Sequence, residues 1–206
     1  MFVPETNRIL HTQALPYYCK NDTEADGNCF FHAIVDQLKN PEIAASISDR
    51  ASHIDLSSHL AIRRAVVDFC RYNNDLQETD FPTWKDNFLA EEKQKSHFFG
   101  LHNDIIWRMW LENMEKSGTW VEEIFVLTTA LFFGKDLLIV QPNFHYTVSG
   151  AMVGQQSHGP PFALVHLHGN HFQSVQRIKE VGLNNQDGNQ QNQPVRHWWH
   201  SICWLL

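Results

Sequence analysis

The chain contains the sequence Asp26-Gly27-Asn28-Cys29-Phe30-Phe31-His32-Ala33, in which a turn passes directly into the start of a helix. Asp, Gly and Asn favour turns, and Gly27 permits backbone angles that other residues avoid. Apolar residues then recur at four-residue steps from Cys29 to Lys39, and Asn40-Pro41 ends the pattern, since helices usually stop before proline. The sequence therefore predicts a buried helix that begins at a cysteine.

A cysteine in this position is a candidate nucleophile. The unpaired amides and the dipole at a helix N-terminus favour negative charge, which lowers the pKa of a thiol. The turn formed by Asp26, Gly27 and Asn28 could also aim backbone amides at one point beside the sulfur of Cys29, as an oxyanion hole requires. The alternative is that Asp26 caps an ordinary core helix and that Cys29 is a buried, inert thiol. This segment on its own does not decide between the two.

Two further helical regions are predicted downstream. Ser57 or Ser58 can cap a helix whose apolar residues share one face. The residues from Phe88 to Met114 are predicted to be helical, with a break near Gly100.

A helix, a tight turn and a central strand are predicted next. Thr119-Trp120-Val121-Glu122 has the pattern of a capping box, which predicts a helix from Trp120 to Phe133. Gly134 would supply the left-handed exit from that helix. Leu137-Leu138-Ile139-Val140 is apolar on both faces, as a central strand would be.

The second half of the chain also contains a predicted strand-loop-strand element. Apolar and polar residues alternate from Phe162 to His168, Gly169-Asn170 marks a turn, and a second run follows from His171 to Val175. The period of two places Gln173 on the same face as His171, so that its amide oxygen could accept a hydrogen bond from the imidazole and fix the tautomer. Helices with strands concentrated in the second half predict an α+β or mixed α/β domain.

The length of 206 residues fits one domain, which we expect to span residues 1–181. The first twenty residues, broken by Pro4 and Pro16, are predicted to be an irregular lead-in. Residues 182–206 are predicted to be a polar, flexible linker followed by an aromatic C-terminal tail, because the run after residue 181 lacks an apolar face.

Composition and charge exclude several classes of protein. The hydrophobic content of 43% is too high for a disordered chain. A net charge of −7 without a dense Lys/Arg block makes nucleic acid a poor partner, and a basic or polar-neutral partner suits the chain better. The longest apolar stretch, Ile124 to Phe133, is about half the ~20 residues of a membrane span, so no membrane partner is expected.

The ends and the cysteines of the chain suggest where it works. The opening residues 1–10 lack the pattern of a signal peptide, so a cytoplasmic location is expected, or the host cytosol for a viral or intracellular bacterial protein. The four cysteines show no CxxC spacing, which argues against a disulfide framework or a zinc ribbon. Cys70 falls on the apolar side of its predicted helix, as a packing thiol would.

Two separated motifs resemble those of the ovarian-tumour (OTU) family of cysteine proteases. Asp26–Ala33 is similar to the nucleophile motif of that family, and His171-Phe172-Gln173-Ser174-Val175 resembles its His-aromatic-x-Ser-Val motif. Trp120–Ile124, with the helix, turn and strand that follow, resembles the block found between them in the family. The resemblance implies a papain-like OTU fold, with a small central, mostly antiparallel sheet packed between helices. It also implies a deubiquitinase that cleaves isopeptide or peptide bonds after the C-terminal glycine pair of ubiquitin.

The resemblance implies roles for individual residues. Cys29 is the nucleophile, His171 is the general base and then the acid, and Asp26 is the motif aspartate that shapes the oxyanion loop. Gln173 stands where many relatives have an acidic residue or Asn. Thiol chemistry of this kind needs no metal or organic cofactor, and the expected partners are ubiquitin or polyubiquitin chains. The oligomeric state and the linkage preference are left open.

Three alternatives remain open at this point. The neutral Gln173 favours a ubiquitin-binding pseudoenzyme of the same fold, and within the enzyme class another ubiquitin-like modifier could be the substrate. A metal site is the rival from another class, because His166-x-His168-x-x-His171 and His197-x-x-His200-x-x-Cys203 are ligand-like patterns for zinc.

Overall fold

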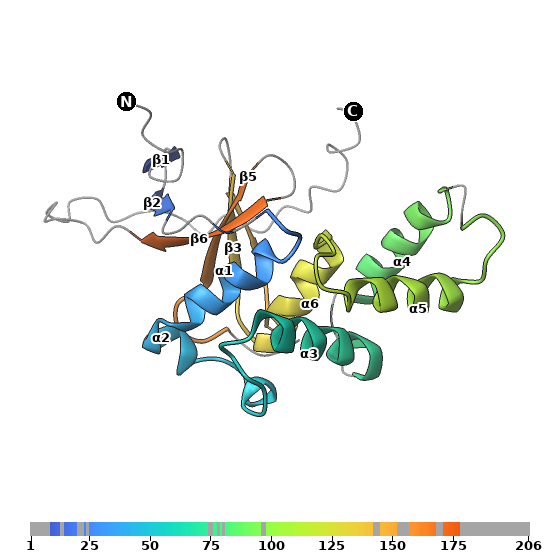
Figure 1. The fold of residues 1–206 in the computed structure, drawn as a ribbon, viewed down its shortest axis with the longest axis horizontal. Helices are drawn as coiled ribbons and strands as arrows, with labels where there is room; N and C mark the ends of the chain where they lie inside the picture. The colour runs from blue at the N-terminus through green and yellow to red at the C-terminus, as the bar shows by residue number, and fades with distance from the viewer. Residues whose placement is uncertain are drawn as a thin grey trace, which may run out of the picture.

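The strands form one six-stranded sheet in the order β1-β2-β6-β5-β3-β4 (Figure 1). This computed structural model describes residues 9–12, 15–19, 23, 25–73, 76–77, 79, 81–95, 98–141, 145–151, 157–167 and 171–177. Among the strand pairs described, only β3 and β5 run parallel. The predicted mixed α/β class and the mostly antiparallel sheet are therefore confirmed. The strands are β1 (Ile9–Thr12), β2 (Leu15–Cys19), β3 (Leu137–Val140), β4 (His145–Val148), β5 (Phe162–Leu167) and β6 (His171–Arg177).

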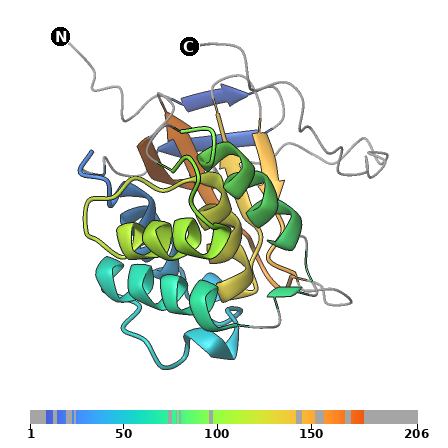
Figure 2. The ribbon, with the colours of Figure 1, turned by 90° about the vertical axis from the view of Figure 1, so that its right-hand side faces the viewer.

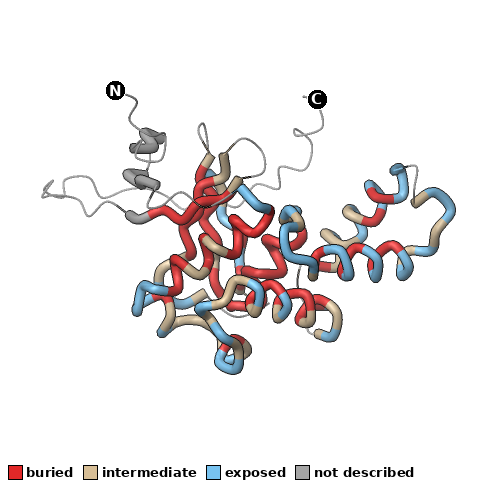
Figure 3. Tube along the Cα trace, viewed as in Figure 1, coloured by how far each residue is buried: buried red, intermediate tan, exposed pale blue. Residues whose placement is uncertain are grey.

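The helices pack into one large apolar cluster with one face of the sheet. Figure 2 shows α3 and α5 running side by side, while the buried residues in Figure 3 concentrate in α1, α6 and the strands. A second, smaller cluster holds described residues of the strands only, on the other face of the sheet. The helices are α1 (Cys29–Leu38), α2 (Pro41–Ala44), α3 (His59–Tyr72), α4 (Phe81–Glu92), α5 (Asn103–Met114) and α6 (Glu123–Phe133), with a 3₁₀ turn, η2 (Asp49–Ala51).

Most of the predicted elements are present. Helix α1 begins at Cys29, as the sequence predicts. Ser58 caps α3 by accepting a hydrogen bond from the amide of Ala61, and the chain between α4 and α5 contains Gly100. Gly134 ends α6 in the left-handed conformation, with φ of 61°, and leads into the fully buried β3. Helix α6 is buried from Ile124 to Phe133 because it lies between the sheet and the other helices.

Two local predictions are wrong. The lead-in is not wholly irregular, because Ile9–Thr12 and Leu15–Cys19 are strands, the second of which pairs with β6. The predicted capping box does not form, and α6 starts at Glu123 instead of Trp120. The hydroxyl of Thr119 donates to Asn113 O at 2.8 Å, and the Glu122 carboxylate accepts from Trp110 Nε1 at 3.0 Å. Both side chains are thus used in tertiary contacts instead of a helix cap.

Some predictions fall on parts of the chain that the structure does not describe. The predicted domain end near residue 181, the 182–206 tail and the Gly169-Asn170 turn lie outside the described residues. Strand β4 was not predicted, because only one of its residues is buried. No helix in the described ranges has the length and apolarity that crossing a membrane requires.

Candidate active site

The thiol of Cys29 lies against the strand that begins at His171. Cys29 is the first residue of α1 and is 1% exposed. Its Sγ accepts a hydrogen bond from the backbone amide of Phe172, at 3.4 Å. Strand β2 pairs with β6 at Val175 and beyond, so the thiol meets β6 nearer to its start. The fold thus brings the two sequence motifs, 143 residues apart, into direct contact.

The environment of Cys29 holds the thiol in its protonated form. Burial raises the pKa of Cys29, and the negative charge of Asp26 acts in the same direction. Hydrogen bonds from the amides of Phe172 and Phe30 lower this pKa but do not outweigh the burial. The lowered pKa expected from the helix N-terminus alone is therefore not what the folded chain shows, because desolvation disfavours the thiolate. A base is needed to activate the sulfur.

His171 and Gln173 both lie on β6, at the positions that the sequence predicts. His171 is half-buried and pairs with Leu167 of β5, and Gln173 is 2% exposed and pairs with Val165. Side chains alternate along a strand, so the two residues share one face of β6. The hydrogen bond from the imidazole to the Gln173 amide stays a prediction.

Phe172, between them, anchors β6 against α1. Its ring packs edge-on against Phe30, with centroids 5.1 Å apart, and stacks flat on His166 at 4.3 Å. Its carbonyl accepts a hydrogen bond from the hydroxyl of Thr23 at 2.6 Å. Hydrogen bonds therefore hold both the amide and the carbonyl of Phe172, the residue next to His171.

Gln37, two turns along α1 from Cys29, connects the helix to two strands. Its Nε2 donates to Ser174 Oγ and to Val175 O, both at 2.8 Å, and its Oε1 accepts from the amide of Ala163 at 3.1 Å. Gln37 is buried, and each contact satisfies a polar group that water does not reach. These bonds set the position of α1 relative to β6, and hence of Cys29 relative to His171.

Asp26 shapes the loop before Cys29 through hydrogen bonds with Asn28. Its carboxylate accepts hydrogen bonds from the Asn28 amide at 2.8 Å and from Asn28 Nδ2 at 3.0 Å. Partial burial opposes ionisation, but these bonds and the nearby His32 outweigh it and lower the pKa of Asp26. The carboxylate is therefore ionised at neutral pH, which fits the loop-shaping role that the family resemblance implies.

Asn28 is buried and bonded on all sides, which sharpens the prediction of an oxyanion loop. Because the Asn28 amide donates to Asp26, it is not aimed at the sulfur. Its side-chain Oδ1 accepts from the amide of Gly118 at 3.0 Å, and its Nδ2 also donates to Ser117 Oγ at 3.2 Å. Asn28 thus holds the loop in place, which leaves the amide of Cys29, at the first residue of α1, as a candidate donor to an oxyanion.

Two glycines let the loop before α1 cross the loop before α6. Gly27 has φ of 78° and Gly118 has φ of 83°, both in the left-handed region that glycine favours. A Cβ atom on Gly27 would fall well inside van der Waals contact with the carbonyl of Gly118. Gly27 is therefore required both by its backbone angle and by the close approach of the second loop.

Arg63 is a residue of this site that the sequence analysis missed. It lies on α3, is fully buried, and donates hydrogen bonds to Gly27 O at 2.8 Å and to Asn28 Oδ1 at 3.2 Å. The signal that could have revealed it is its spacing, because it stands three and four residues before Val66 and Val67 on the apolar face of its helix. A charged residue on a buried face needs buried partners.

The structure lends no support to the metal-site alternative within the part of the chain that it describes. No group of three or more His, Cys, Asp or Glu side chains in that part could hold a metal ion. His166 instead faces Gln141, whose Nε2 lies 3.1 Å from its Nδ1. His168 and the pattern from His197 to Cys203 lie outside the described residues.

Solved structures of similar fold include OTU domains. An OTU deubiquitinase from Wolbachia pipientis wMel matches with a TM-score of 0.53 at 12% identity, over 78% of this chain and 88% of that one. The viral OTU domain protease from Farallon virus matches with a TM-score of 0.49 at 14% identity, over 79% of this chain and 85% of that one. At such identities the first of these shows that the fold is shared.

Sequence comparison gives the family. No curated protein matches the chain. The model of the OTU-like cysteine protease family matches residues 24–172, a range that begins just before Asp26 and ends just after His171. The chain therefore belongs to the OTU-like cysteine protease family.

Proposed function

We propose that the chain is a deubiquitinase that hydrolyses the isopeptide or peptide bond after the C-terminal glycine of ubiquitin, with Cys29 as the nucleophile and His171 as the base. The observation that carries the proposal is the hydrogen bond from the Phe172 amide to Cys29 Sγ, because it joins the two motifs. Membership of the cysteine protease family supports the reaction class. The Wolbachia protein of the same fold is described as a deubiquitinase, which makes ubiquitin the first modifier to test.

The reaction begins with proton transfer from the Cys29 thiol to the imidazole of His171, and the sulfur attacks the carbonyl carbon of the terminal glycine of ubiquitin. The C–N bond to the lysine amine breaks, and His171 returns the proton to the leaving nitrogen. Water then gives a proton to the same imidazole and attacks the thioester. The C–S bond breaks, the glycine carboxylate leaves, and Cys29 recovers its proton.

The start of α1 supplies the groups that stabilise the intermediate. Negative charge develops on the glycine carbonyl oxygen as the sulfur attacks, and backbone amides fixed before the reaction stabilise it most effectively. The amide of Cys29 belongs to the first residue of α1, where the helix dipole adds a positive potential. Asp26 and Asn28 act by keeping the loop in this shape.

Gln173 is the third member of the proposed triad. Its amide oxygen holds the imidazole tautomer that leaves the other ring nitrogen available as a base. A neutral amide orients the ring but stabilises the imidazolium less than a carboxylate does. The net charge of −7 also suits the basic C-terminal tail of ubiquitin.

The test is incubation with ubiquitin that carries a thiol-reactive electrophile at its C-terminus, followed by hydrolysis of ubiquitin chains. We expect the wild type to form a covalent adduct, Cys29→Ala to form none, and His171→Ala to react slowly. Cys70→Ala is the matched control, because Cys70 is a second buried thiol that the mechanism does not use.

Each other outcome has a definite meaning. Binding of ubiquitin without adduct or turnover by folded wild type would favour the pseudoenzyme. An adduct only with another ubiquitin-like modifier would keep the chemistry and change the substrate. An adduct on Cys29 that also forms fully in His171→Ala would remove His171 from the mechanism.

A further inference from the structure

The guanidinium of Arg63 lies beneath the loop that precedes Cys29. Its side chain is 0% exposed, and it donates to four oxygens. Two belong to the loop before α1, namely Gly27 O at 2.8 Å and Asn28 Oδ1 at 3.2 Å. The other two are Met114 O, at the last residue of α5, at 2.9 Å, and Thr119 O, in the segment between α5 and α6, at 2.8 Å. One side chain thus joins both loops that cross at this site.

These partners fit an arginine and not a lysine. A buried charge is costly unless hydrogen bonds satisfy it, and the planar fork of guanidinium can address several oxygens at fixed angles. The guanidinium also lies 4.7 Å from the centre of the Phe31 ring, in a cation–π arrangement. Burial lowers the pKa of Arg63 to about 10, against the opposing charges of Asp26 and Cys29. Arg63 therefore stays charged at neutral pH.

The contact with Gly27 fixes the peptide that leads into the nucleophile. The Gly27 carbonyl binds Arg63, and the amide of the same peptide unit, that of Asn28, donates to Asp26. A peptide is planar, so holding both its ends sets its orientation. The next amide along the chain is that of Cys29. Its direction is set by this plane together with the Asn28 φ of −100° and ψ of −2°, and the Asn28 carbonyl of the same peptide unit accepts from the amide of His32 at 3.0 Å.

We propose that Arg63 is a positioning residue, which holds the Gly27–Asn28 peptide so that the Cys29 amide points at the oxyanion formed on the substrate. This inference rests on the proposed function, because it assigns a role in the same reaction. Arg63 acts through the loop and does not touch the substrate. Its loss should therefore slow the step that needs an oxyanion hole and spare a reaction of the same sulfur that needs none.

The comparison of Arg63→Lys with Arg64→Lys tests this inference. Arg64 is adjacent, its side chain is 72% exposed, and its ion pair with Glu115 is long, at 3.9 Å. We expect Arg63→Lys to lower kcat for ubiquitin hydrolysis by ~100-fold with KM changed less than ~3-fold, because a shift of about 1 Å at a catalytic group costs this much. Alkylation of Cys29 by iodoacetamide involves no oxyanion, so its rate should change less than ~3-fold. Arg64→Lys should match the wild type in both.

A purely structural role gives a different pattern. The rates of hydrolysis and of alkylation would then both fall, along with the melting temperature, or the two rates would both stay unchanged. Either result would overturn the inference. If Arg63→Lys does not fold, Asn28→Ala takes its place, because it removes one of the four acceptors. That variant should also lose hydrolysis while it keeps alkylation, and a parallel loss of both would again count against the positioning role.

Hydrogen exchange separates this inference from the proposed function. The Gly118 amide donates to Asn28 Oδ1, which also binds Arg63, so the Gly118 amide reports on the loop without any substrate. We expect Arg63→Lys to exchange this amide at least ~10-fold faster than the wild type and Arg64→Lys to leave it unchanged. If the wild type protects the Gly118 amide from exchange but hydrolyses no substrate, the proposed function is wrong. Unchanged exchange in Arg63→Lys would end the inference even in an active enzyme.

Discussion

The start of α1 and the α4–α5 pair are held in the fold by different kinds of contact. Around α1, side-chain hydrogen bonds from Arg63, Gln37 and Thr23 reach backbone carbonyls of distant segments. In the α4–α5 pair, aromatic rings join the helices, with Phe88 of α4 against Trp107 and Trp110 of α5 at centroid distances of 6.0 and 4.9 Å. Apolar packing tolerates small shifts, whereas a hydrogen bond weakens steeply with poor geometry. Directional contacts are therefore concentrated where the reacting atoms must be aligned.

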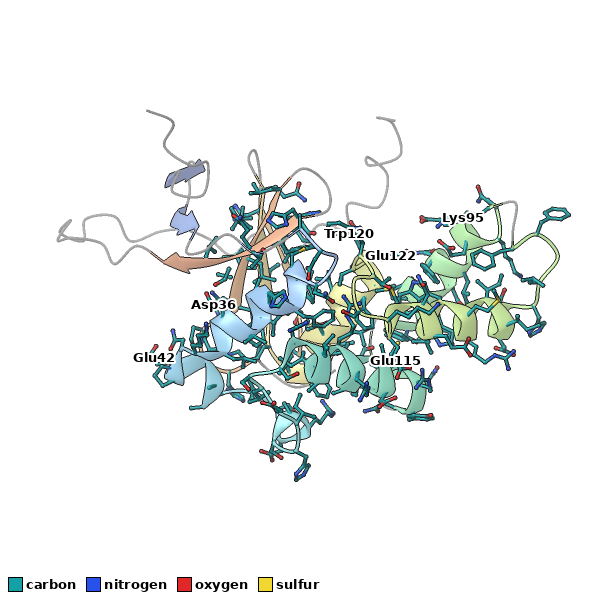
Figure 4. The ribbon with its side chains drawn as sticks, viewed as in Figure 1. Asp36, Glu42, Lys95, Glu115, Trp120 and Glu122 are labelled. Carbon is teal, nitrogen blue, oxygen red and sulfur yellow. The ribbon has the colours of Figure 1, made fainter. Side chains whose placement is uncertain are left out.

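The two regions also differ in exposure. Figure 4 shows Lys95 at the far end of the α4–α5 pair and Trp120 and Glu122 at its near end, beside the start of α6. Phe99, between α4 and α5, is 85% exposed, whereas Phe30 and Phe31 of α1 are buried. Substitutions near the start of α1 should thus affect activity, whereas substitutions in the α4–α5 pair should affect stability alone.

Gly27→Ala should have the largest effect. The added Cβ would meet the Gly118 carbonyl at a φ of 78°, so the two loops must move apart, and we expect a loss of about 1–3 kcal/mol of stability and ~100-fold in kcat/KM. Gly100→Ala is the matched change in the other region, because Gly100 has φ of 80° with no atom within 4 Å of its Cβ position. It should leave kcat/KM unchanged. Equal losses of activity in the two variants would refute the contrast between the regions.

The pH dependence of thiol alkylation should be the next largest effect. Burial raises the pKa of Cys29, so its thiolate fraction is small at neutral pH and should increase about tenfold per pH unit from pH 7 towards 9. Cys70 contributes nothing in this range, because burial raises its pKa to about 12. Iodoacetamide labelling, followed by mass spectrometry of the peptide that contains Cys29, separates this thiol from Cys19, Cys70 and Cys203. A rate that levels off below pH 7 would show a thiolate already formed in the free enzyme.

Gln37→Met should have a moderate effect on both properties. The change keeps the volume but leaves Val175 O and the amide of Ala163 without this partner in a buried site, which should cost about 1–3 kcal/mol of stability. Because α1 can then shift along β6, we also expect ~10-fold lower kcat/KM. Trp107→Phe is the comparison variant from the α4–α5 pair. It should lower the stability measured by urea unfolding and leave kcat/KM unchanged. An unchanged kcat/KM in Gln37→Met would show that packing alone sets the position of α1.

Lys95→Ala should have the smallest effect. Lys95 pairs with Glu92 near the end of α4, half-exposed to solvent. Lys95 is half-exposed but the Glu92 carboxylate is buried, so the loss of the pair should cost about 1 kcal/mol of stability by urea unfolding, and hydrolysis should not change. A clear loss of ubiquitin hydrolysis would show that the α4–α5 pair contributes to substrate binding.

The sequence predicted the elements that depend on local patterns. Helix α1, the Gly134 exit and strands β3 and β6 are each specified by residues next to one another in the chain, and all are found. Cys29 lies against the start of β6, where its Sγ accepts a hydrogen bond from the amide of Phe172, next to His171. The role of Gln173 in orienting the imidazole stays a prediction.

What the sequence could not predict depends on distant partners. The carbonyls that bind Arg63 lie 36, 51 and 56 residues away, and a backbone carbonyl leaves no mark in a side-chain pattern. Thr119 and Glu122 matched a local capping box, but contacts with Asn113 and Trp110 used both side chains. Tertiary contacts override local preference in such cases.

The crossing of the loops at Gly27 and Gly118 has a consequence for directed evolution. Gly27 leaves no room for a side chain against the Gly118 carbonyl, and Gly118 has φ of 83° with the Asp26 carbonyl close to its Cβ position, so a library that randomises residues 115–119 alone would return mostly inactive clones. Libraries that vary residues 26–28 and 115–119 together would recover compensating pairs. The segment around Gly100 carries no such restriction, so insertions and affinity tags belong there.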